Sequence, residues 1–253
     1  MFKTEMTSQE EHYEQLLGLS GAWKVSGVQL ELAAKRIVVE IYYDHTQPLE
    51  CPECGQSCPH YDDREMREWR HLDTMQFETL LRCEVPRCNC PEHGVKTVHV
   101  PWAGKGSRFT LLFESFAIDV LKACSSVKAA AELMGMNWHQ INQIKRRAVA
   151  RGLERRQATP VEHLGIDEKS FRKGHNYISI LTDLDRSLVL DVAEDRDESA
   201  CDKLFEGLTE EQLKEVKAIA MDMWRAYIKA ARSHMPDADI VHDRFHISQH
   251  LNQ

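Results

Sequence analysis

The sequence predicts a multidomain α+β protein in which a cysteine-rich β domain, a helical domain and a mixed α/β sheet follow one another. Three observations support this fold class. Six of the eight cysteines lie between Cys51 and Cys90, residues 107–153 have the apolar spacing of helices, and strand-like and helix-like segments alternate after Pro160. With 253 residues, 42% of them hydrophobic, the chain can bury several small cores. We expect four parts, at residues 1–50, 51–100, 107–156 and 160–253.

Composition and charge narrow the class of protein. No stretch approaches the roughly 18 consecutive apolar residues that cross a membrane, and the first residues lack the basic and apolar segments of a secretory signal. These features predict a cytoplasmic protein without membrane contact. The net charge of −8 opposes nucleic-acid binding, but residues 101–160 hold ten Lys and Arg against four Asp and Glu. That one basic segment could attract phosphates.

The N-terminal half predicts β structure and a metal site. Val25 to Tyr43 alternates like two strands joined by a short turn, so residues 1–50 are expected to be a β-rich lead-in. Cys51-Pro-Glu-Cys54-Gly has the spacing of a zinc knuckle. Structural zinc takes four tetrahedral sulfur or nitrogen ligands, which predicts an N-terminal zinc ribbon with Zn²⁺ held by Cys51, Cys54, Cys83 and Cys88. The fourth ligand stays open, with Cys58, His60, Cys90 and His93 as nearby alternatives.

The basic segment contains a predicted helix-turn-helix. In SVKAAAELMGMNWHQINQIKRR, residues 126–147, the positions of Ala131, Gly135, Ile141 and Ile144 suit two helices packed across a turn. The second helix, starting near Asn137, would then be the recognition helix, whose polar side chains read base edges while its cations meet phosphates. The predicted DNA-binding residues are Asn137, His139, Gln140, Asn142, Gln143, Lys145, Arg146 and Arg147. The same tri-helical packing also occurs in proteins that do not bind DNA.

The C-terminal part predicts a mixed sheet that carries two acids. The expected order is β-β-β-α-β-α-β, with strands at residues 165–171, 176–183, 187–193, 217–223 and 238–245, and helices at 198–207 and 226–234. In the ribonuclease-H-like arrangement of this order the first and fourth strands are neighbours. Asp167 and Asp222 lie on those strands, where paired carboxylates can bind Mg²⁺ or Mn²⁺ for phosphoryl chemistry. Taken singly, each Asp also fits a strand-end or turn position.

In this order, the motifs resemble the DDE transposases of bacterial insertion sequences, specifically the ISL-three family. The resemblance rests on CPECG and RCEVPRC, the helix-turn-helix, GIDEKSFRKGHNYISILTDLD, AIAMDMWRAYIKA and VHDRFHI. It implies that Asp167 and Asp222 are the first two catalytic acids. The family's third acid, a Glu, lies on a helix beyond the strand carrying VHDRFH, so the resemblance implies an incomplete ribonuclease-H-like domain and a C-terminally truncated protein. Residues 1–253 alone are expected to cleave little DNA, and Asp243 and Glu168 are the first substitutes to test.

The resemblance also implies a function and partners. A transposase would bind the terminal inverted repeats of its element in double-stranded DNA, act as a homo-oligomer on that DNA, and cleave and transfer strands with Mg²⁺ or Mn²⁺. The alternative interpretation is a non-catalytic zinc-ribbon and helix-turn-helix protein that regulates the element. A zinc hydrolase is disfavoured, because the sequence contains no H-E-x-x-H motif.

Overall fold

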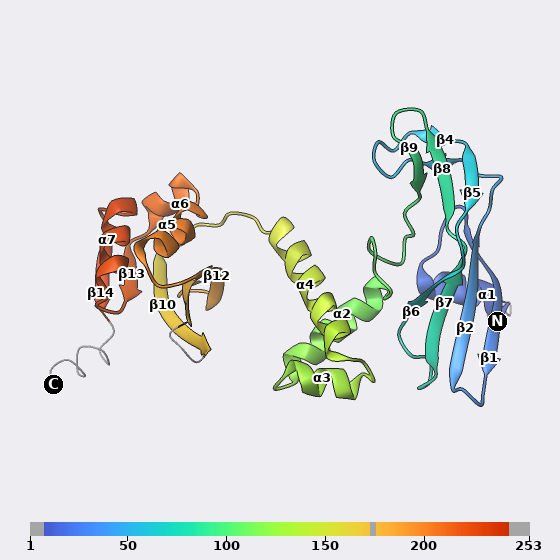
Figure 1. Cartoon of the computed structure of the whole chain (residues 1–253), viewed down its shortest axis with the longest axis horizontal. Helices are drawn as coiled ribbons and strands as arrows, with labels where there is room; N and C mark the ends of the chain where they lie inside the picture. Colours follow the sequence, from blue (N-terminus) through green and yellow to red (C-terminus); the bar gives the residue numbers. More distant parts are fainter. Residues whose placement is uncertain (1–7, 173–175, 243–253) are drawn as a thin grey trace, which may run out of the picture. The chain divides into compact units, whose positions relative to one another are not determined.

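The computed structural model describes residues 8–172 and 176–242 of the chain. It contains two compact units, residues 1–154 and 155–253, which are coloured from blue to yellow-green and from yellow to red in Figure 1. Each unit is a mixture of helices and strands, in agreement with the predicted α+β class.

The first unit begins with a helix that the sequence analysis did not predict. Helix α1 (Gln9–Leu17) starts with a capping box, in which the Ser8 hydroxyl accepts a hydrogen bond from the Glu11 backbone N–H and the Glu11 carboxylate accepts one from the Ser8 N–H. Left-handed Gly18, with φ of 63°, ends the helix. The lead-in is therefore not β structure alone.

A four-stranded sheet with the order β1-β2-β7-β6 forms the body of this unit. The expected hairpin is present as β1 (Trp23–Glu31) and β2 (Arg36–Tyr43). Strand β7 (Glu78–Cys83) runs parallel to β2 and pairs on its other side with β6 (Arg67–Arg70). The lead-in and the cysteine-rich segment thus share one sheet, with Val39, Trp69 and Leu81 among the buried residues of their common core.

Two smaller sheets, together with the loop between β3 and β4, hold five of the eight cysteines. One pairs β3 (Leu49–Glu50) with β4 (Ser57–Cys58), and the other has the order β5-β8-β9, formed by β5 (His60–Asp63), β8 (Pro86–Cys90) and β9 (Gly94–Thr97). Cys58 of β4 and Cys88 and Cys90 of β8 are buried in the same core as the larger sheet.

The basic segment folds as three helices, α2 (Leu111–Ala123), α3 (Val127–Leu133) and α4 (Trp138–Glu154). Gly135 has φ of 62° in the turn between α3 and α4, a conformation that glycine adopts without strain. Ala131, Ile141 and Ile144 are buried. The packing predicted for these residues is confirmed.

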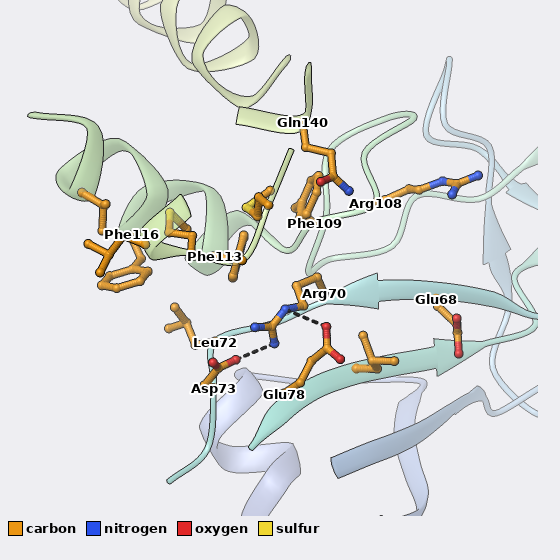
Figure 2. A pocket seen from close by; sticks show the side chains of 16 residues that line it. Glu68, Arg70, Leu72, Asp73, Glu78, Arg108, Phe109, Phe113, Phe116 and Gln140 are labelled. Atoms are coloured by element: carbon orange, nitrogen blue, oxygen red, sulfur yellow. Dashed lines mark ion pairs between the residues drawn. The ribbon is translucent and has the colours of Figure 1, made fainter. Parts of the chain in front are cut away.

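A short junction links the sheet to the helices within the first unit. The Arg70 carbonyl accepts a hydrogen bond from the Thr110 N–H at 3.0 Å, and the Arg70 side chain pairs with Asp73 at 2.5 Å and Glu78 at 3.2 Å. Figure 2 shows these ion pairs at the edge of a pocket that is also lined by Phe113 and Gln140. The backbone hydrogen bond therefore joins the end of β6 to the N-terminus of α2.

The second unit is a five-stranded sheet with the order β12-β11-β10-β13-β14. Its strands are β10 (His163–Arg172), β11 (Asn176–Asp183), β12 (Leu188–Glu194), β13 (Ala218–Met221) and β14 (Asp239–His242). Strands β10 to β12 are antiparallel, whereas β13 runs parallel to β10 and β14 runs parallel to β13. The first and fourth strands are neighbours, as expected.

Three helices connect the strands of this unit. The expected helices are α5 (Glu198–Glu206) and α7 (Arg225–His234), and α6 (Glu210–Glu215) is additional. Phe205 of α5 and Tyr227 of α7 are buried in one core with Leu164 of β10 and Ile219 of β13. Among the helices described, none is both long and apolar enough to cross a membrane.

Candidate functional site

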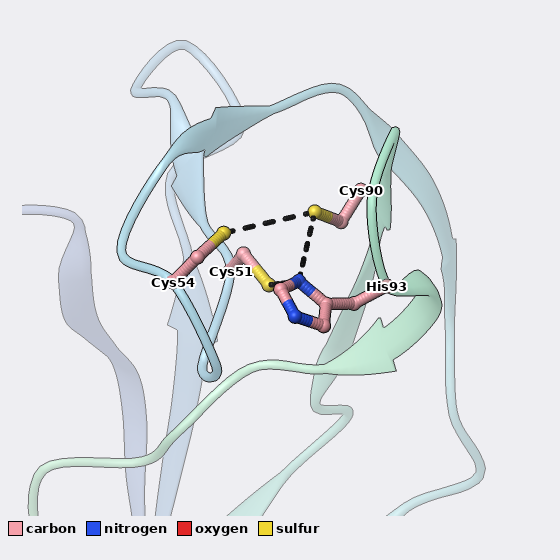
Figure 3. Close-up of side chains that lie close together, drawn as sticks. All are labelled: Cys51, Cys54, Cys90 and His93. Carbon is pink, nitrogen blue, oxygen red and sulfur yellow. Dashed lines mark hydrogen bonds between the residues drawn. The ribbon is translucent and has the colours of Figure 1, made fainter.

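Three cysteines and one histidine converge at the tip of the small sheets. Cys51 and Cys54 lie in the loop between β3 and β4, Cys90 ends β8, and His93 lies in the turn before β9. Their sulfur and nitrogen atoms all lie within 4.8 Å of one another. Figure 3 shows the four side chains pointing toward a common centre.

The distances in this cluster suit a tetrahedral metal ion. The Cys54 and Cys90 sulfurs are 3.8 Å apart, and the His93 Nδ1 lies 3.8 Å from the Cys51 sulfur and 3.6 Å from the Cys90 sulfur. Zinc bonds of about 2.3 Å to sulfur and about 2.1 Å to nitrogen would leave tetrahedral ligand atoms about 3.5 to 3.8 Å apart. The donor set and its spacing therefore fit Zn²⁺ in a closed structural site.

The ligand set differs from the predicted one in its second pair. Cys51 and Cys54 are in the cluster, but Cys83 and Cys88 are not. Cys83 is buried at the end of β7, where burial raises the pKa of its thiol to about 12. Cys88 is fully buried in β8, and burial raises the pKa of its thiol as well. Both thiols are thus core side chains in this structure.

The sequence carries a signal for the second pair that the prediction did not use. Cys90-Pro-Glu-His93-Gly repeats Cys51-Pro-Glu-Cys54-Gly with histidine in the last ligand position. Gly55 and Gly94 both have positive φ, 73° and 67°, so both segments use glycine to turn the chain. Burial opposes ionisation of Cys90, but the backbone N–H groups of His93 and Glu92 lower its pKa to about 7. The second knuckle therefore favours the thiolate form of Cys90.

The predicted recognition helix is α4, and its first turn is held by two of the predicted DNA-binding amides. The Asn137 side chain accepts a hydrogen bond from the Gln140 N–H at 2.9 Å, and the Gln140 side chain accepts one from the Asn137 N–H at 3.0 Å. This reciprocal cap satisfies backbone donors that the helix itself leaves free. His139, Gln143, Lys145 and Arg146 are exposed, whereas Asn142 is half-buried.

Arg147, the remaining predicted phosphate contact, lies partly inside the helical domain. Its guanidinium is 2.7 Å from the carboxylate of Glu114, a fully buried residue of α2. Arg151 pairs with the other oxygen of the same carboxylate at 2.9 Å, and the Ser107 hydroxyl donates to Glu114 at 2.8 Å. Two of the cations that made this segment basic therefore neutralise a buried acid.

The two predicted acids come from neighbouring strands. The parallel register pairs Gly165 of β10 with Ala220 of β13, Asp167 lies two residues farther along β10, and Asp222 directly follows the end of β13 at Met221. Asp167 is exposed and Asp222 is half-buried. One oxygen of Asp222 accepts a hydrogen bond from the Trp224 N–H at 2.9 Å. Among the described residues, no third ligand-type side chain joins these two within the spacing seen for the cysteine cluster.

Glu168 is a third acid at this place. Burial and the neighbouring carboxylates of Asp222 and Asp167 raise the pKa of Glu168, while Arg196 opposes the shift. Its Oε2 is buried, and a side-chain hydrogen bond with Asp222 adds to the rise in pKa. The two acids can therefore share a proton, and a divalent cation in its place would neutralise both. Asp243, the other substitute considered from the sequence, lies outside the described residues.

Aromatic and basic side chains surround these acids. The Arg196 guanidinium lies 3.4 Å from the Glu168 carboxylate and 4.6 Å from the centroid of the Trp224 ring. The indole N–H of Trp224 donates to the Arg196 carbonyl at 2.8 Å. A pocket of about 610 Å³ beside this pair is also lined by Arg225 and Lys229. The lining of this pocket is of mixed charge, because it also contains Asp195, Asp197 and Glu198, and Glu198 pairs with Lys229.

Three known families match successive parts of the chain. Residues 47–93 match the zinc-finger of transposase IS204/IS1001/IS1096/IS1165, residues 98–149 match the helix-turn-helix domain of transposase family ISL3, and residues 164–253 match the DDE domain of the same family, described as transposase. The first match spans the cysteine cluster, the second spans α2, α3 and the larger part of α4, and the third spans both predicted acids.

Two curated relatives agree with these matches. The transposase for insertion sequence element IS1557 of Mycobacterium tuberculosis is 32% identical over 202 residues, which are 78% of this chain and 45% of that protein. The transposase for insertion sequence element IS1001 of Bordetella parapertussis is 26% identical over 198 residues, which are 78% of this chain and 48% of that protein. The matched region spans about half the length of each relative.

Proposed function

The chain belongs to the ISL3 family of insertion-sequence transposases, and we propose that it binds the ends of its element and contributes carboxylates to DNA strand cleavage and transfer. The observation that supports the catalytic part is the pairing of β10, which carries Asp167, with β13, which ends one residue before Asp222. The strand order, with β10 between β11 and β13, supports a ribonuclease-H-like arrangement for this unit.

Asp167 and Asp222 are the residues that would hold a divalent ion, and Glu168 lies beside Asp222. Carboxylate oxygens suit Mg²⁺ or Mn²⁺. When bound, such ions activate the attacking oxygen and stabilise the leaving oxygen of a phosphodiester. The chain's own contribution is to hold acids against one another on rigid strands, with Arg196 and Trp224 beside them to position the DNA backbone.

Recognition of the terminal inverted repeats is assigned to α4. His139, Gln143, Lys145 and Arg146 form the exposed part of the predicted set, so Gln143 and His139 would meet base edges while the two cations meet phosphates. The zinc cluster would stabilise the ribbon, because metal binding to four ligands from distant segments is coupled to folding. Two element ends must be handled in one reaction, which favours a homo-oligomer on the DNA.

The DNA-binding part is tested with two duplexes, one carrying the element's terminal inverted repeat and one with the same bases in scrambled order. The expected result is tighter binding of the repeat, measured by fluorescence anisotropy at fixed salt. Equal affinity for both duplexes would contradict end recognition. Replacing Gln143 by Ala should reduce the difference between the duplexes, since it removes a side chain assigned to base contacts.

The metal-binding part is tested separately from activity. Mg²⁺ or Mn²⁺ should raise the unfolding temperature of the chain, because a ligand that binds only the folded state stabilises it. Asp222→Asn should abolish that rise, whereas Asp185→Asn, a matched change of an exposed acid in the same unit, should retain it. An equal rise in both variants would contradict the assignment. Any Mg²⁺-dependent cleavage of repeat-containing DNA should be lost in Asp167→Ala and Asp222→Ala with DNA binding retained.

A further inference from the structure

Two histidines and an aspartate form a second group of ligand-type side chains in the first unit, and it shares no residue with the cysteine cluster. His45 Nε2 lies 3.5 Å from one carboxylate oxygen of Asp63, and His60 Nε2 lies 3.1 Å from the other. The centroids of the two imidazole rings are 4.3 Å apart. All three side chains are exposed, and their ligand-type atoms lie within 4.8 Å of one another.

A strand irregularity brings His60 and Asp63 to one side of β5. In a regular strand, residues three apart point to opposite faces. Here the register against β8 slips at Tyr61, so that His60 pairs with Cys88 and Asp63 with Pro86. Because Cys88 and Pro86 are two residues apart, their partners share a face. A β-bulge of this kind re-aims side chains, which is a common use of bulges near binding sites.

His45 is positioned by a separate turn after β2. The Asp44 carboxylate accepts hydrogen bonds from the Thr46 N–H at 3.0 Å and the Thr46 hydroxyl at 2.7 Å, and the Asp44 carbonyl accepts one from the Gln47 N–H at 3.0 Å. These bonds fix the loop that carries His45. The site is therefore organised by the hydrogen bonds of the turn that carries His45 and by the register of β5, which carries His60 and Asp63.

We propose that His45, His60 and Asp63 form a second site for a divalent transition-metal ion such as Zn²⁺. Bonds of about 2.1 Å to nitrogen and oxygen would place cis ligand atoms about 3.0 to 3.4 Å apart, close to the two observed distances. Imidazole with carboxylate is a donor set that Zn²⁺ accepts, with water completing the coordination. The adjacent hollow of about 260 Å³ is lined by Glu40 and Glu84 and by one cation, Arg82, which pairs with Glu68.

The site would join the loop after β2 to β5 through ligands other than those of the cysteine cluster. Because the three ligands are exposed, binding is expected to be weaker than in the cysteine cluster and reversible by dialysis. The proposed site does not depend on the proposed transposase activity. Its three ligands belong to the first unit, whereas the proposed catalytic acids belong to the second.

The experiment counts zinc on the full chain. Protein purified with its cysteine-cluster zinc in place is titrated with Zn²⁺ in excess Mg²⁺, which occupies the carboxylates of the second unit, and binding is followed by calorimetry. A second equivalent is expected. Its affinity should fall at least about tenfold in His45→Ala and in His60→Ala, while His12→Ala, a change of an exposed histidine on α1, should bind like the unchanged protein.

Two outcomes would overturn the proposal. One is a single zinc equivalent in the unchanged protein, and the other is a second equivalent that survives in both His45→Ala and His60→Ala. Elemental analysis after dialysis provides the control for folding, because each variant should keep the zinc of the cysteine cluster. Asp63→Asn is a further variant, in which the new side chain has nearly the same size. It should weaken zinc binding at the His45, His60 and Asp63 site while the cysteine cluster keeps its zinc.

Discussion

Arg147 of α4 reaches across the helical domain to Glu114 of α2, with 2.7 Å between guanidinium and carboxylate. Glu114 is fully buried and the Arg147 side chain is about a quarter exposed, at 26%. The pair therefore ties the recognition helix to the first helix of the domain. An ionised acid in such a place is unstable without its cations, so the pair is required by the packing of the domain whether or not DNA is bound.

Removing Arg147 should destabilise the helical domain. We expect Arg147→Ala to lower the free energy of unfolding by about 1 to 3 kcal/mol, the usual cost of leaving a charged group short of a partner, because Arg151 and Ser107 still contact Glu114. The neighbouring change Arg146→Ala, at an exposed position, should cost no more than about 0.5 kcal/mol. Urea unfolding of both variants measures the difference, and equal costs would show that the buried pair contributes little.

The exposed cations of α4 should carry the salt dependence of DNA binding. Replacing Lys145 and Arg146 together by Ala should reduce the slope of log K against log salt concentration by about 0.9 for each phosphate that these cations neutralise. Lys122→Ala, which removes an exposed cation of α2 that pairs with Asp119, serves as the control and should leave the slope unchanged. An unaltered slope in the double variant would place the phosphate-binding cations elsewhere.

Zinc binding should depend on the second knuckle. Cys90→Ala and His93→Ala should each lower the zinc content well below one per chain, because each removes one of four convergent ligands. Cys83→Ala and Cys88→Ala should keep the zinc, although both remove a buried side chain and lower stability. Elemental analysis of protein purified without chelator separates the two sets. Retention of zinc in His93→Ala, with loss in Cys88→Ala, would restore the ligand set predicted from the sequence.

The junction between ribbon and helices should weaken in acid. Burial, with the nearby charge of Arg70, lowers the pKa of His71 below the ordinary histidine value, and its Nδ1 lies 2.9 Å from the Thr110 hydroxyl. Folding thus favours the neutral ring. Its contribution to stability is present above the ordinary histidine pKa and is lost as the pH falls through the lowered one.

His71→Gln keeps a polar side chain but cannot titrate, so the variant should lose part of the decline in stability below about pH 6.5. The measurement is the unfolding free energy at several pH values. His139→Gln is the matched control, because His139 is exposed, and it should leave the pH dependence as it was. Superimposable curves for unchanged and His71→Gln proteins would refute the assignment.

The sequence by itself determined the kind and order of most elements. Residues 176–183 were predicted as a strand and form β11 over the same range, and the helix predicted at 198–207 is α5 at Glu198–Glu206. Apolar periodicity and turn residues act locally, so they can be read along the chain. The buried positions of Ala131, Ile141 and Ile144 followed from the same spacing, as did the placement of Asp167 and Asp222 on or next to strands.

Only the tertiary structure decided which side chains meet. The choice of Cys90 and His93 over Cys83 and Cys88 depends on how the β8–β9 turn approaches the loop between β3 and β4. The pairing of Arg147 with Glu114 depends on helix packing, and the meeting of His45 with Asp63 depends on a bulge in β5. Such contacts join residues far apart in the chain. They depend on strand register and on the balance between burial and charge, and neither of these produces a periodic pattern in the sequence.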